Sequence, residues 1–360
     1  MKKNIGQPPG NSPLTHIPPD YCPPGTGFWL ELPAGADRGK HIFYRDSVHG
    51  KGDAKAVIVL VHGNPECSYS YRKIIDNITR SISKPCRIVA MDHIGFGRSD
   101  QASFEMTAMD HAANLFLLIR HLDLRHVTLV VHDWGGPIGI GAFLREPERV
   151  ANLVLLNTTV FPIPDTGYTY HKNYPIPCVP WSKFPSVTPD RLWGALIDYA
   201  IYRKPAGAFR IILDLGVHML RSELGITAWT DRNAQMVYRE QFRTRANARS
   251  SKRLVRQTAA WGTGSIYRDP KLGLRDTRGF YAFIQDKLSQ AWGPQGRNIG
   301  ARALIGRWDP LGKDEVIAQW IKHLPQLEGN VTIYEKAGHF VHIEQPEAIA
   351  GAVLDVAGLK

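Results

Sequence analysis

The chain has 360 residues, of which 43% are hydrophobic and 21% are charged, and its formal net charge at pH 7 is +11. This composition is that of a globular domain, and it excludes disordered, collagen-like and coiled-coil chains. The length allows one large core or a core with an inserted lid. No apolar run approaches the roughly 20 residues that span a bilayer, and no apolar stretch of a secretory signal follows Lys2 and Lys3. We therefore expect a cytoplasmic protein without an integral membrane span.

Strands and helices alternate along the first part of the chain. After an irregular N-terminal extension (1–26), the segments GFWLELP and HIFYRDS predict two short strands at a sheet edge. Nearly continuous apolar runs then predict strands that are buried on both faces, with helices between them. These strands are expected at 56–61, 87–91, 127–132 and 153–157, and the helices at about 69–81, 105–122 and 134–146. Such alternation predicts an α/β protein with a mostly parallel, doubly wound sheet.

The alternation breaks at about residue 160. From there to about residue 293 the chain is rich in aromatic, proline and basic residues, and it predicts mostly helices and loops. Alternation resumes with strands at 301–306 and 331–335 and helices at 313–323 and 345–357. We therefore expect an eight-stranded core in two segments with a helical cap inserted between them. The expected parts are the extension 1–26, the core segments 27–160 and 295–360, and the cap 161–294.

The positive charge and the cysteines indicate neither a nucleic acid nor a metal. The densest basic stretch has residues three or four apart, which would line one helix face, and such a face is usually solvated. Attraction to an anionic substrate or a membrane surface is the main alternative. No nucleic-acid-binding motif accompanies the stretch. The cysteines form no CxxC pair, so we expect reduced thiols and neither a metal nor a cofactor. The basic residues are Arg239, Arg243, Arg245, Arg249, Lys252, Arg253 and Arg256, and the cysteines are Cys22, Cys67, Cys86 and Cys178.

The run VHDWGG lies between a predicted strand and a predicted helix. A nucleophile elbow has this form, in which a sharp turn holds the nucleophile above the carboxyl end of the sheet. The central residue is usually Ser, and here it is Asp133. Gly135 leaves room for the turn, and Gly136 lets the helix pack closely. The alternative is that Asp133 only caps the helix.

Two partners of a nucleophile follow later strands, in the order nucleophile, acid, histidine that is typical of this motif. Asp309 follows the strand predicted at 301–306, and His339 follows the strand at 331–335. Both would reach the carboxyl end of the sheet, where Asp133 lies. Alone, Asp309 would be a turn residue and His339 a surface or core residue, but three matches in this order favour a catalytic triad. His342 is the weaker candidate for the base, because it falls within the following turn or helix.

A fourth element, His62-Gly63-Asn64-Pro65, directly follows the first buried strand. In this arrangement the backbone N–H groups of Asn64 and Trp134 would stabilise an oxyanion. The side chains of Asn64 and Trp134 also carry N–H donors, which would suit a small anionic leaving group beside Asp133. The alternative is a simple Asn-Pro turn.

The segments HGNP, DHIGFGRSD, VVHDWGG and AGHFVHIEQPE together resemble the haloalkane dehalogenase family of the α/β-hydrolases. The resemblance covers roughly 55–160 and 300–357, and the cap is only loosely similar. It implies the α/β-hydrolase fold, with Asp133 as nucleophile, His339 as base and Asp309 as orienting acid. Asn64 and Trp134 match the halide-binding pair. One branch of the family carries its acid directly after the strand at 153–157, where this chain has Asn157, so Asp309 is the better choice.

Relatives of this family share the aspartate nucleophile. Epoxide hydrolases use two cap tyrosines and usually have an aromatic residue at position 64, so Asn64 argues against them despite the many tyrosines of the cap. Fluoroacetate dehalogenases have an Arg-rich motif after the nucleophile, which is lacking here. The β-lactone decarboxylases of olefin biosynthesis share the catalytic set and resemble the segment 157–164. The cap tyrosines are Tyr168, Tyr170, Tyr199, Tyr202 and Tyr238.

These features predict a hydrolase that cleaves carbon–halogen bonds of small apolar haloalkanes through an aspartyl ester and releases alcohol and halide. A β-lactone decarboxylase is the rival prediction, and an epoxide hydrolase is a further one. The non-enzyme alternative is a ligand-binding homologue that has lost catalysis, which the intact triad Asp133, Asp309 and His339 disfavours. The substrate, the cap residues that line its pocket and the oligomeric state do not follow from the sequence.

Overall fold

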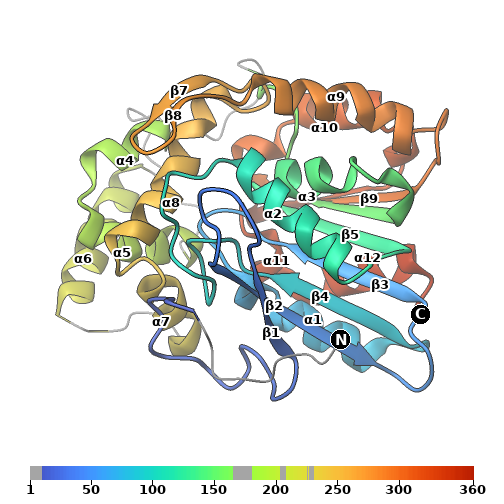
Figure 1. Cartoon of the computed structure of the whole chain (residues 1–360), viewed down its shortest axis with the longest axis horizontal. Coiled ribbons are helices and arrows are strands. Elements are labelled where there is room, and N and C mark those ends of the chain that lie inside the picture. The colour runs from blue at the N-terminus through green and yellow to red at the C-terminus, as the bar shows by residue number, and fades with distance from the viewer. Residues whose placement is uncertain (1–9, 165–180, 203–207, 225, 227–230) are drawn as a thin grey trace.

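A computed structural model describes residues 10–164, 181–202, 208–224, 226 and 231–360. Its centre is an eight-stranded sheet in the order β1-β2-β4-β3-β5-β6-β9-β10 (Figure 1). The bounds are β1 Gly27–Glu31, β2 His41–His49, β3 Ala56–Val61, β4 Cys86–Met91, β5 Val127–His132, β6 Val150–Leu156, β9 Gly300–Trp308 and β10 Val331–Gly338. Strand β2 is antiparallel to β1 and β4, and the strands from β4 to β10 are parallel. The predicted eight-stranded, mostly parallel sheet is confirmed.

Helices cover both faces of this sheet because its central strands are apolar on both sides. Successive side chains of a strand point to opposite faces, and in β3 they divide between two cores. Val57, Val59 and Val61 pack with residues of α2 (Ala108–His121), α3 (Gly135–Phe143) and α9 (Arg278–Trp292). Ile58 and Leu60 pack with residues of α1 (Arg72–Ser81) and α12 (Pro346–Ala357). The site therefore rests on a layered core rather than on a loop.

The helix ends follow local sequence signals. Thr107 and Asp110 form a capping box at the start of α2. Helix α12 ends at Gly358, whose φ of +64° lies in the left-handed region that favours glycine. The segment predicted as one helix at 69–81 begins with a short 3-10 turn, η1 (Ser68–Tyr71), and continues as α1. Two further helices flank the last strands, α10 (Asp314–His323) and the short α11 (Val341–Glu344).

Between β6 and β9 the chain forms the helices α4 (Phe184–Val187), α5 (Asp190–Tyr202), α6 (Ala208–Glu223), α7 (Arg232–Glu240) and α8 (Arg245–Gln257). Figure 1 shows α4 to α7 gathered at one end of the molecule. A short hairpin, β7 (Ile266–Asp269) and β8 (Gly273–Asp276), follows; the expectation of mostly helices and loops did not include it. Helix α9 packs against α3 and so covers the sheet. The exact limits of cap and core stay predictions.

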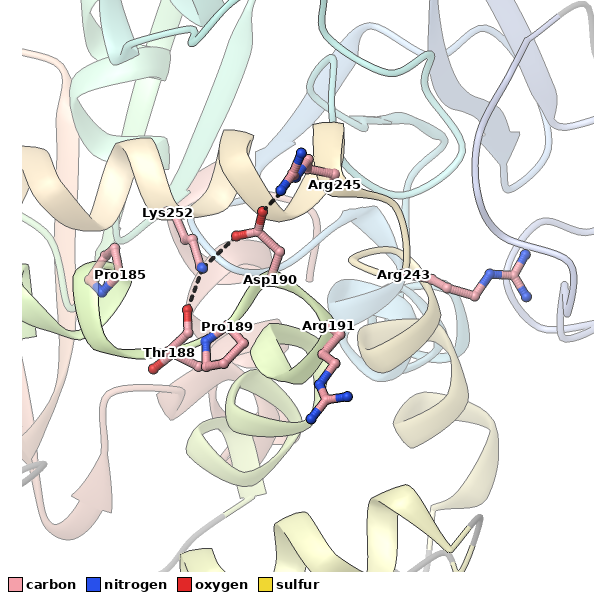
Figure 2. Close-up of a pocket in the computed structure, with 8 residues that line it drawn as sticks. All are labelled: Pro185, Thr188, Pro189, Asp190, Arg191, Arg243, Arg245 and Lys252. Atoms are coloured by element: carbon pink, nitrogen blue, oxygen red, sulfur yellow. Dashed lines mark hydrogen bonds and ion pairs between the residues drawn. The ribbon is translucent and has the colours of Figure 1, made fainter.

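The basic stretch differs from its prediction as one solvated helix face. Arg239 lies in α7, Arg243 lies in the turn that follows, and the remaining basic residues lie in α8. One of them, Lys252, is buried at 3% exposure. The Lys252 ammonium donates to Asp190 Oδ1 and to the Thr188 carbonyl, both at 2.6 Å, and Arg245 lies 3.3 Å from the same carboxylate (Figure 2). These residues line a hollow of about 650 Å³ in the cap. Asp190 balances part of the positive charge that lines this hollow, because it forms ion pairs with Lys252 and Arg245.

The remaining predictions concern the N-terminus and particular side chains. The described part of the extension, 10–26, contains neither helix nor strand, but it packs on the core through Tyr21, which is buried and donates to Asp92. Cys22, Cys67 and Cys86 are free thiols, as predicted. No helix in the described ranges is long and apolar enough to cross a membrane. The predictions for Tyr168, Tyr170, Cys178 and the Tyr202 side chain lie outside the described residues.

Candidate active site

Asp133 lies in the sharp turn between β5 and α3 and has a φ of +52°, in the left-handed region that few residues other than glycine adopt. Its carbonyl oxygen accepts hydrogen bonds from the Thr158 hydroxyl at 2.6 Å and from the Gly136 N–H at 3.0 Å. Its own N–H donates to the Asn157 carbonyl at 3.3 Å. The turn after β6 thus holds the strained backbone of Asp133 in place.

The two glycines after the turn are required by close packing. A Cβ atom on Gly135 would collide with the carbonyl oxygen of Val61 at the end of β3, and one on Gly136 would collide with Thr158. The first of these neighbours is backbone and cannot rotate away. The elbow therefore needs glycine at position 135, as the sequence indicated.

We expect Gly135→Ala to lower the free energy of unfolding by about 2 kcal/mol or more, because overpacking against backbone forces the elbow to shift. Urea unfolding measures this change. Gly279→Ala in α9 is the matched control, since nothing lies within 4 Å of its added Cβ, and it should leave stability unchanged or raise it slightly. Equal stability of Gly135→Ala and wild type would contradict this account of the turn.

His339 follows β10 and connects the other two triad residues. Its Nδ1 lies 2.8 Å from Asp309 Oδ2, and its Nε2 lies 3.3 Å from Asp133 Oδ2. The side chains of Asp133, Asp309 and His339 are 8%, 1% and 11% exposed. The structure therefore brings the three residues together in one nearly dry chain of contacts, in the order that the sequence suggested.

Asn157 holds Asp309, and sequence reasoning treated it only as the lack of an acid. Its side-chain N–H group donates to Asp309 Oδ2 at 2.5 Å and to the Gly306 carbonyl at 2.9 Å, and its Oδ1 accepts from the Gly306 N–H at 2.7 Å. One amide thus fixes both the end of β9 and the carboxylate that follows it. The position after β6 keeps a role in orienting the triad although it carries no charge.

The two carboxylates determine the protonation of His339. Burial alone would lower the pKa of this imidazole, but the charge of Asp309 and the hydrogen bonds to Asp133 and Asp309 outweigh burial and raise its pKa well above the ordinary value. The ring is therefore cationic near neutral pH. Loss of the charge on Asp133 would remove part of this stabilisation and favour the neutral ring.

Asn64 and Trp134 are the two predicted donors next to the nucleophile. Asn64 hydrogen-bonds Asp133, and Trp134 directly follows it in the chain. The Asn64 backbone N–H donates to Asp133 Oδ1 at 2.7 Å. Nothing among the described residues hydrogen-bonds the buried side-chain oxygen of Asn64. The Trp134 ring is buried and lies 4.0 Å from the Trp261 ring, whose indole N–H donates to the Thr159 carbonyl at 2.7 Å. Trp261, which the sequence analysis did not single out, packs against the Trp134 ring and restricts its position.

His342 does not reach the nucleophile. Its Nε2 lies 2.6 Å from Glu66 Oε1, and Glu66 Oε2 lies 2.7 Å from Nδ1 of His132. All three side chains are fully buried beside the elbow. The ranking of His339 over His342 as the base agrees with these contacts. Sequence reasoning missed Glu66, whose only signal was an acidic residue directly after His62-Gly63-Asn64-Pro65.

Among the described cap tyrosines, Tyr199 donates its O–H to the Ile211 carbonyl at 3.2 Å within the cap. An epoxide hydrolase would need such a hydroxyl to point at the substrate oxygen instead. Tyr199 therefore gives no support to the epoxide hydrolase alternative.

Comparison with known proteins relates this chain to enzymes of one fold. The family model described as the alpha/beta hydrolase fold matches residues 56–175. A cis-3-alkyl-4-alkyloxetan-2-one decarboxylase of Shewanella oneidensis is 38% identical over 128 residues, which are 34% of this chain and 37% of that protein. Haloalkane dehalogenase 1 of Mycobacterium tuberculosis is 35% identical over 153 residues, which are 42% of this chain and 48% of that protein. The matched part of the chain therefore spans less than half the length of these relatives.

Solved structures extend the likeness to nearly the whole chain at the level of the fold. The haloalkane dehalogenase DpaA of Paraglaciecola agarilytica covers 94% of this chain and 93% of its own, with 21% identity and a TM-score of 0.64. A loop variant of the haloalkane dehalogenase DbeA from Bradyrhizobium elkanii covers 93% of this chain and 97% of its own, with 21% identity and a TM-score of 0.60. The common feature is the α/β-hydrolase fold.

Proposed function

We propose that the chain is an enzyme of the haloalkane dehalogenase-like α/β-hydrolases, and that its Asp133 carboxylate displaces halide from small apolar haloalkanes. The observation that carries this proposal is the buried chain of contacts Asp133–His339–Asp309, at 3.3 and 2.8 Å. A carboxylate in place of a hydroxyl nucleophile suits attack on an alkyl carbon, because it needs no base to activate it.

In the first step, a carboxylate oxygen of Asp133 forms a bond to the alkyl carbon as the carbon–halogen bond breaks. The products are an alkyl ester of Asp133 and a halide ion. The side-chain N–H groups of Asn64 and Trp134 stabilise the departing halide. Two observations support this role: the Asn64 backbone N–H is bonded to Asp133 Oδ1, and Trp134 directly follows Asp133 with its buried ring packed on Trp261.

In the second step, His339 takes a proton from water, and the resulting hydroxide attacks the ester carbonyl carbon. Esterification removes the charge of Asp133, so the pKa of His339 falls from its raised value and the neutral ring becomes available as a base. The Asn64 N–H already holds Asp133 Oδ1 at 2.7 Å, so the oxyanion would develop against a donor that is in place. Alcohol and the Asp133 carboxylate are released, and the reaction consumes one water.

A second candidate function has specific support from the curated relatives, since one that matches at 38% identity is a cis-3-alkyl-4-alkyloxetan-2-one decarboxylase. In that reaction Asp133 would attack the ring carbon that bears the ring oxygen, so that this C–O bond breaks and the adduct is an ester of Asp133 that carries a free carboxylate. The adduct would then lose carbon dioxide, which leaves an alkene and the Asp133 carboxylate. Asp133, His339 and Asn64 would keep their places, so substrate shape decides between the two functions.

One assay panel separates these functions. Purified protein is given bromo- and chloroalkanes, with halide release as the readout, and a long-chain cis-β-lactone, with alkene and carbon dioxide as the readouts. Halide release without alkene formation is the expected result. Alkene formation alone would assign the decarboxylase function, and no product from any substrate would contradict the proposal of an enzyme of either class.

Asp309→Asn tests the orienting acid. We expect ester hydrolysis to slow by about 10²-fold or more, because the variant loses the charge that favours protonation of His339 in the transition state. The first step should change by no more than about threefold, since a carboxylate nucleophile needs no base. Rapid-quench measurement of the halide burst and of the later steady rate gives both steps. Equal rates in the variant and wild type would contradict the assignment of Asp309.

A further inference from the structure

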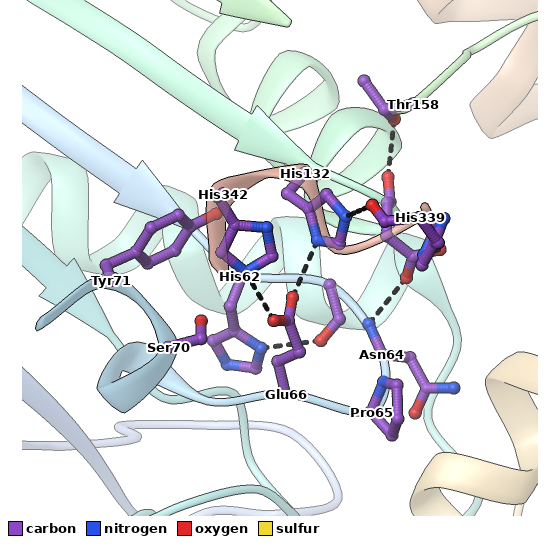
Figure 3. Close-up of polar contacts among 12 residues, drawn as sticks. His62, Asn64, Pro65, Glu66, Ser70, Tyr71, His132, Thr158, His339 and His342 are labelled. Atoms are coloured by element: carbon purple, nitrogen blue, oxygen red, sulfur yellow. Dashed lines mark hydrogen bonds and ion pairs between the residues drawn. The ribbon is translucent and has the colours of Figure 1, made fainter. Parts of the chain in front are cut away.

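A polar cluster is buried directly beside the nucleophile. Glu66, His132 and His342 have fully buried side chains and make two short contacts, at 2.7 Å between Glu66 and His132 and 2.6 Å between Glu66 and His342 (Figure 3). The other ring nitrogen of His132, Nε2, lies 2.8 Å from the backbone carbonyl oxygen of His339. One histidine, adjacent to Asp133 in sequence, therefore connects a buried carboxylate to the backbone of the base.

The acceptors around His132 determine its protonation. A carbonyl oxygen can only accept a hydrogen bond, so Nε2 of His132 must carry a proton. Its Nδ1 faces the Glu66 carboxylate, which also accepts a bond from His342. Burial would raise the pKa of the Glu66 carboxyl, but the contacts with His342 and His132, which both hydrogen-bond it, outweigh burial and keep the pKa below its ordinary value. Burial lowers the pKa of His342 to about 4, so that ring is neutral.

The two partners of His132 are both acceptors, a carboxylate at Nδ1 and a carbonyl at Nε2, so each ring nitrogen must donate a proton to its partner. A buried carboxylate needs a buried cation beside it, and His132 with protons on both nitrogens supplies this charge while satisfying both acceptors. The ligand atoms of the cluster lie within 4.8 Å of one another, which would also admit a metal ion. A divalent cation with a single carboxylate would leave a net positive charge in a dry site. The cluster therefore fits an ion pair better than a metal.

We propose that Glu66 and His132 are positioning residues, which hold the His339 carbonyl through a buried ion pair and thereby keep the His339 ring aimed at Asp133. The groups near the pair include His339 and Phe340 after β10, His342 in α11, Tyr71 in η1 and His62 after β3. The inference rests on the proposed function for its effect on catalysis, but the ion pair itself does not.

The hydrogen bond from His132 to the His339 carbonyl should affect only the step in which His339 acts. His339 acts as a base only in ester hydrolysis, and a shift of about 1 Å in a catalytic group can slow a step by about 10²-fold. Loss of the His132 hydrogen bond should therefore slow hydrolysis of the ester and spare its formation. A purely structural role would lower both steps together.

The experiment measures the two steps in His132→Phe and Glu66→Gln, with the substrate that the wild type turns over. In His132→Phe we expect ester hydrolysis to slow by roughly 10- to 100-fold and the halide burst or corresponding first step to change by no more than about threefold. Glu66→Gln keeps the size of the side chain and a donor toward His132, so its loss should be smaller. If His132→Phe does not fold, the comparison of the two steps in Glu66→Gln still tests the proposal.

His342→Phe is the matched control, because it removes a buried hydrogen bond to Glu66 but does not touch His339. Its stability should fall while ester hydrolysis changes by less than about threefold. Equal slowing in His342→Phe and His132→Phe, or an equal loss of both steps in His132→Phe, would overturn the positioning role.

A second readout needs no substrate. Nitrogen-15 spectra of labelled protein should show protons on both ring nitrogens of His132 at neutral pH, and on one of them in Glu66→Gln. A single protonated ring nitrogen in the wild type, or a stoichiometric metal ion in the purified protein, would overturn the ion pair. If the wild type converts no substrate, the proposed function fails, and these spectra still decide whether the pair exists.

Discussion

Asp133→Asn is expected to abolish turnover, with a loss of more than about 10⁴-fold, because the amide cannot form the ester. His339→Phe should fail at the later step instead. It should release one equivalent of halide in a burst and then stop, since the ester forms without a base and cannot be hydrolysed. Mass spectrometry of the peptide that contains Asp133 should then show the added alkyl group.

Asp123→Asn is the matched control for the nucleophile variant. Asp123 also has a positive φ, of 43°, but its side chain is 62% exposed and pairs with Arg125 and Arg149 far from the triad. Its turnover should equal that of the wild type. An unmodified Asp133 peptide in His339→Phe, together with an active wild type, would refute the covalent mechanism.

Acid is expected to destabilise the fold steeply between about pH 6.5 and 4.5. Burial lowers the pKa of His62 to about 4, that of His93 well below its ordinary value, and that of His111 to about 3. His342 also has a lowered pKa, of about 4. The unfolded chain binds protons at these histidines near pH 6.5 while the folded chain does not, so stability is lost as pH falls.

Each such histidine should cost about 1.4 kcal/mol for every pH unit below 6.5 until its folded pKa is reached. His339 does not reverse this trend, because a raised pKa contributes stability that is already complete below 6.5 and is lost only at higher pH. Urea unfolding at pH 7.5, 6.0 and 5.0 measures the slope.

His111→Leu tests this explanation with a single change. Both ring nitrogens of His111 are buried without a hydrogen-bond partner among the described residues, so leucine removes a proton-binding group at nearly constant volume. The slope of stability against pH should fall by about 1.4 kcal/mol per pH unit, and the variant should be more stable than the wild type at pH 5. An unchanged slope, or a wild type with constant stability from pH 7.5 to 5.0, would contradict it.

The core and the triad were predictable because each follows from several local sequence patterns that independently indicate the same structure. Continuous apolar runs indicate strands buried on both faces, and the carboxyl ends of parallel strands meet at one edge of the sheet. A polar residue directly after such a strand, as with Asp133, Asp309 and His339, is therefore placed without knowledge of side-chain contacts. The order of the three residues along the chain then removed most alternatives.

Contacts between distant segments were not predictable in this way. The pairing of Lys252 with Asp190 depends on how α5 packs against α8, and no local pattern of charges contains that information. Asn157 and Trp261 act through single hydrogen bonds to Asp309 and Thr159, which their sequence neighbours do not reveal. Glu66 likewise gains its partners from strands and helices that follow it by more than 60 residues.

The central claim is that the oxygen of the product comes from Asp133 and not directly from water. One turnover of a bromoalkane in water labelled with oxygen-18, with enzyme in excess, tests it most directly. The account predicts unlabelled alcohol and one oxygen-18 atom in the carboxylate of Asp133. Labelled alcohol from the first turnover, with an unlabelled Asp133 peptide, would contradict the ester intermediate and with it the proposed mechanism.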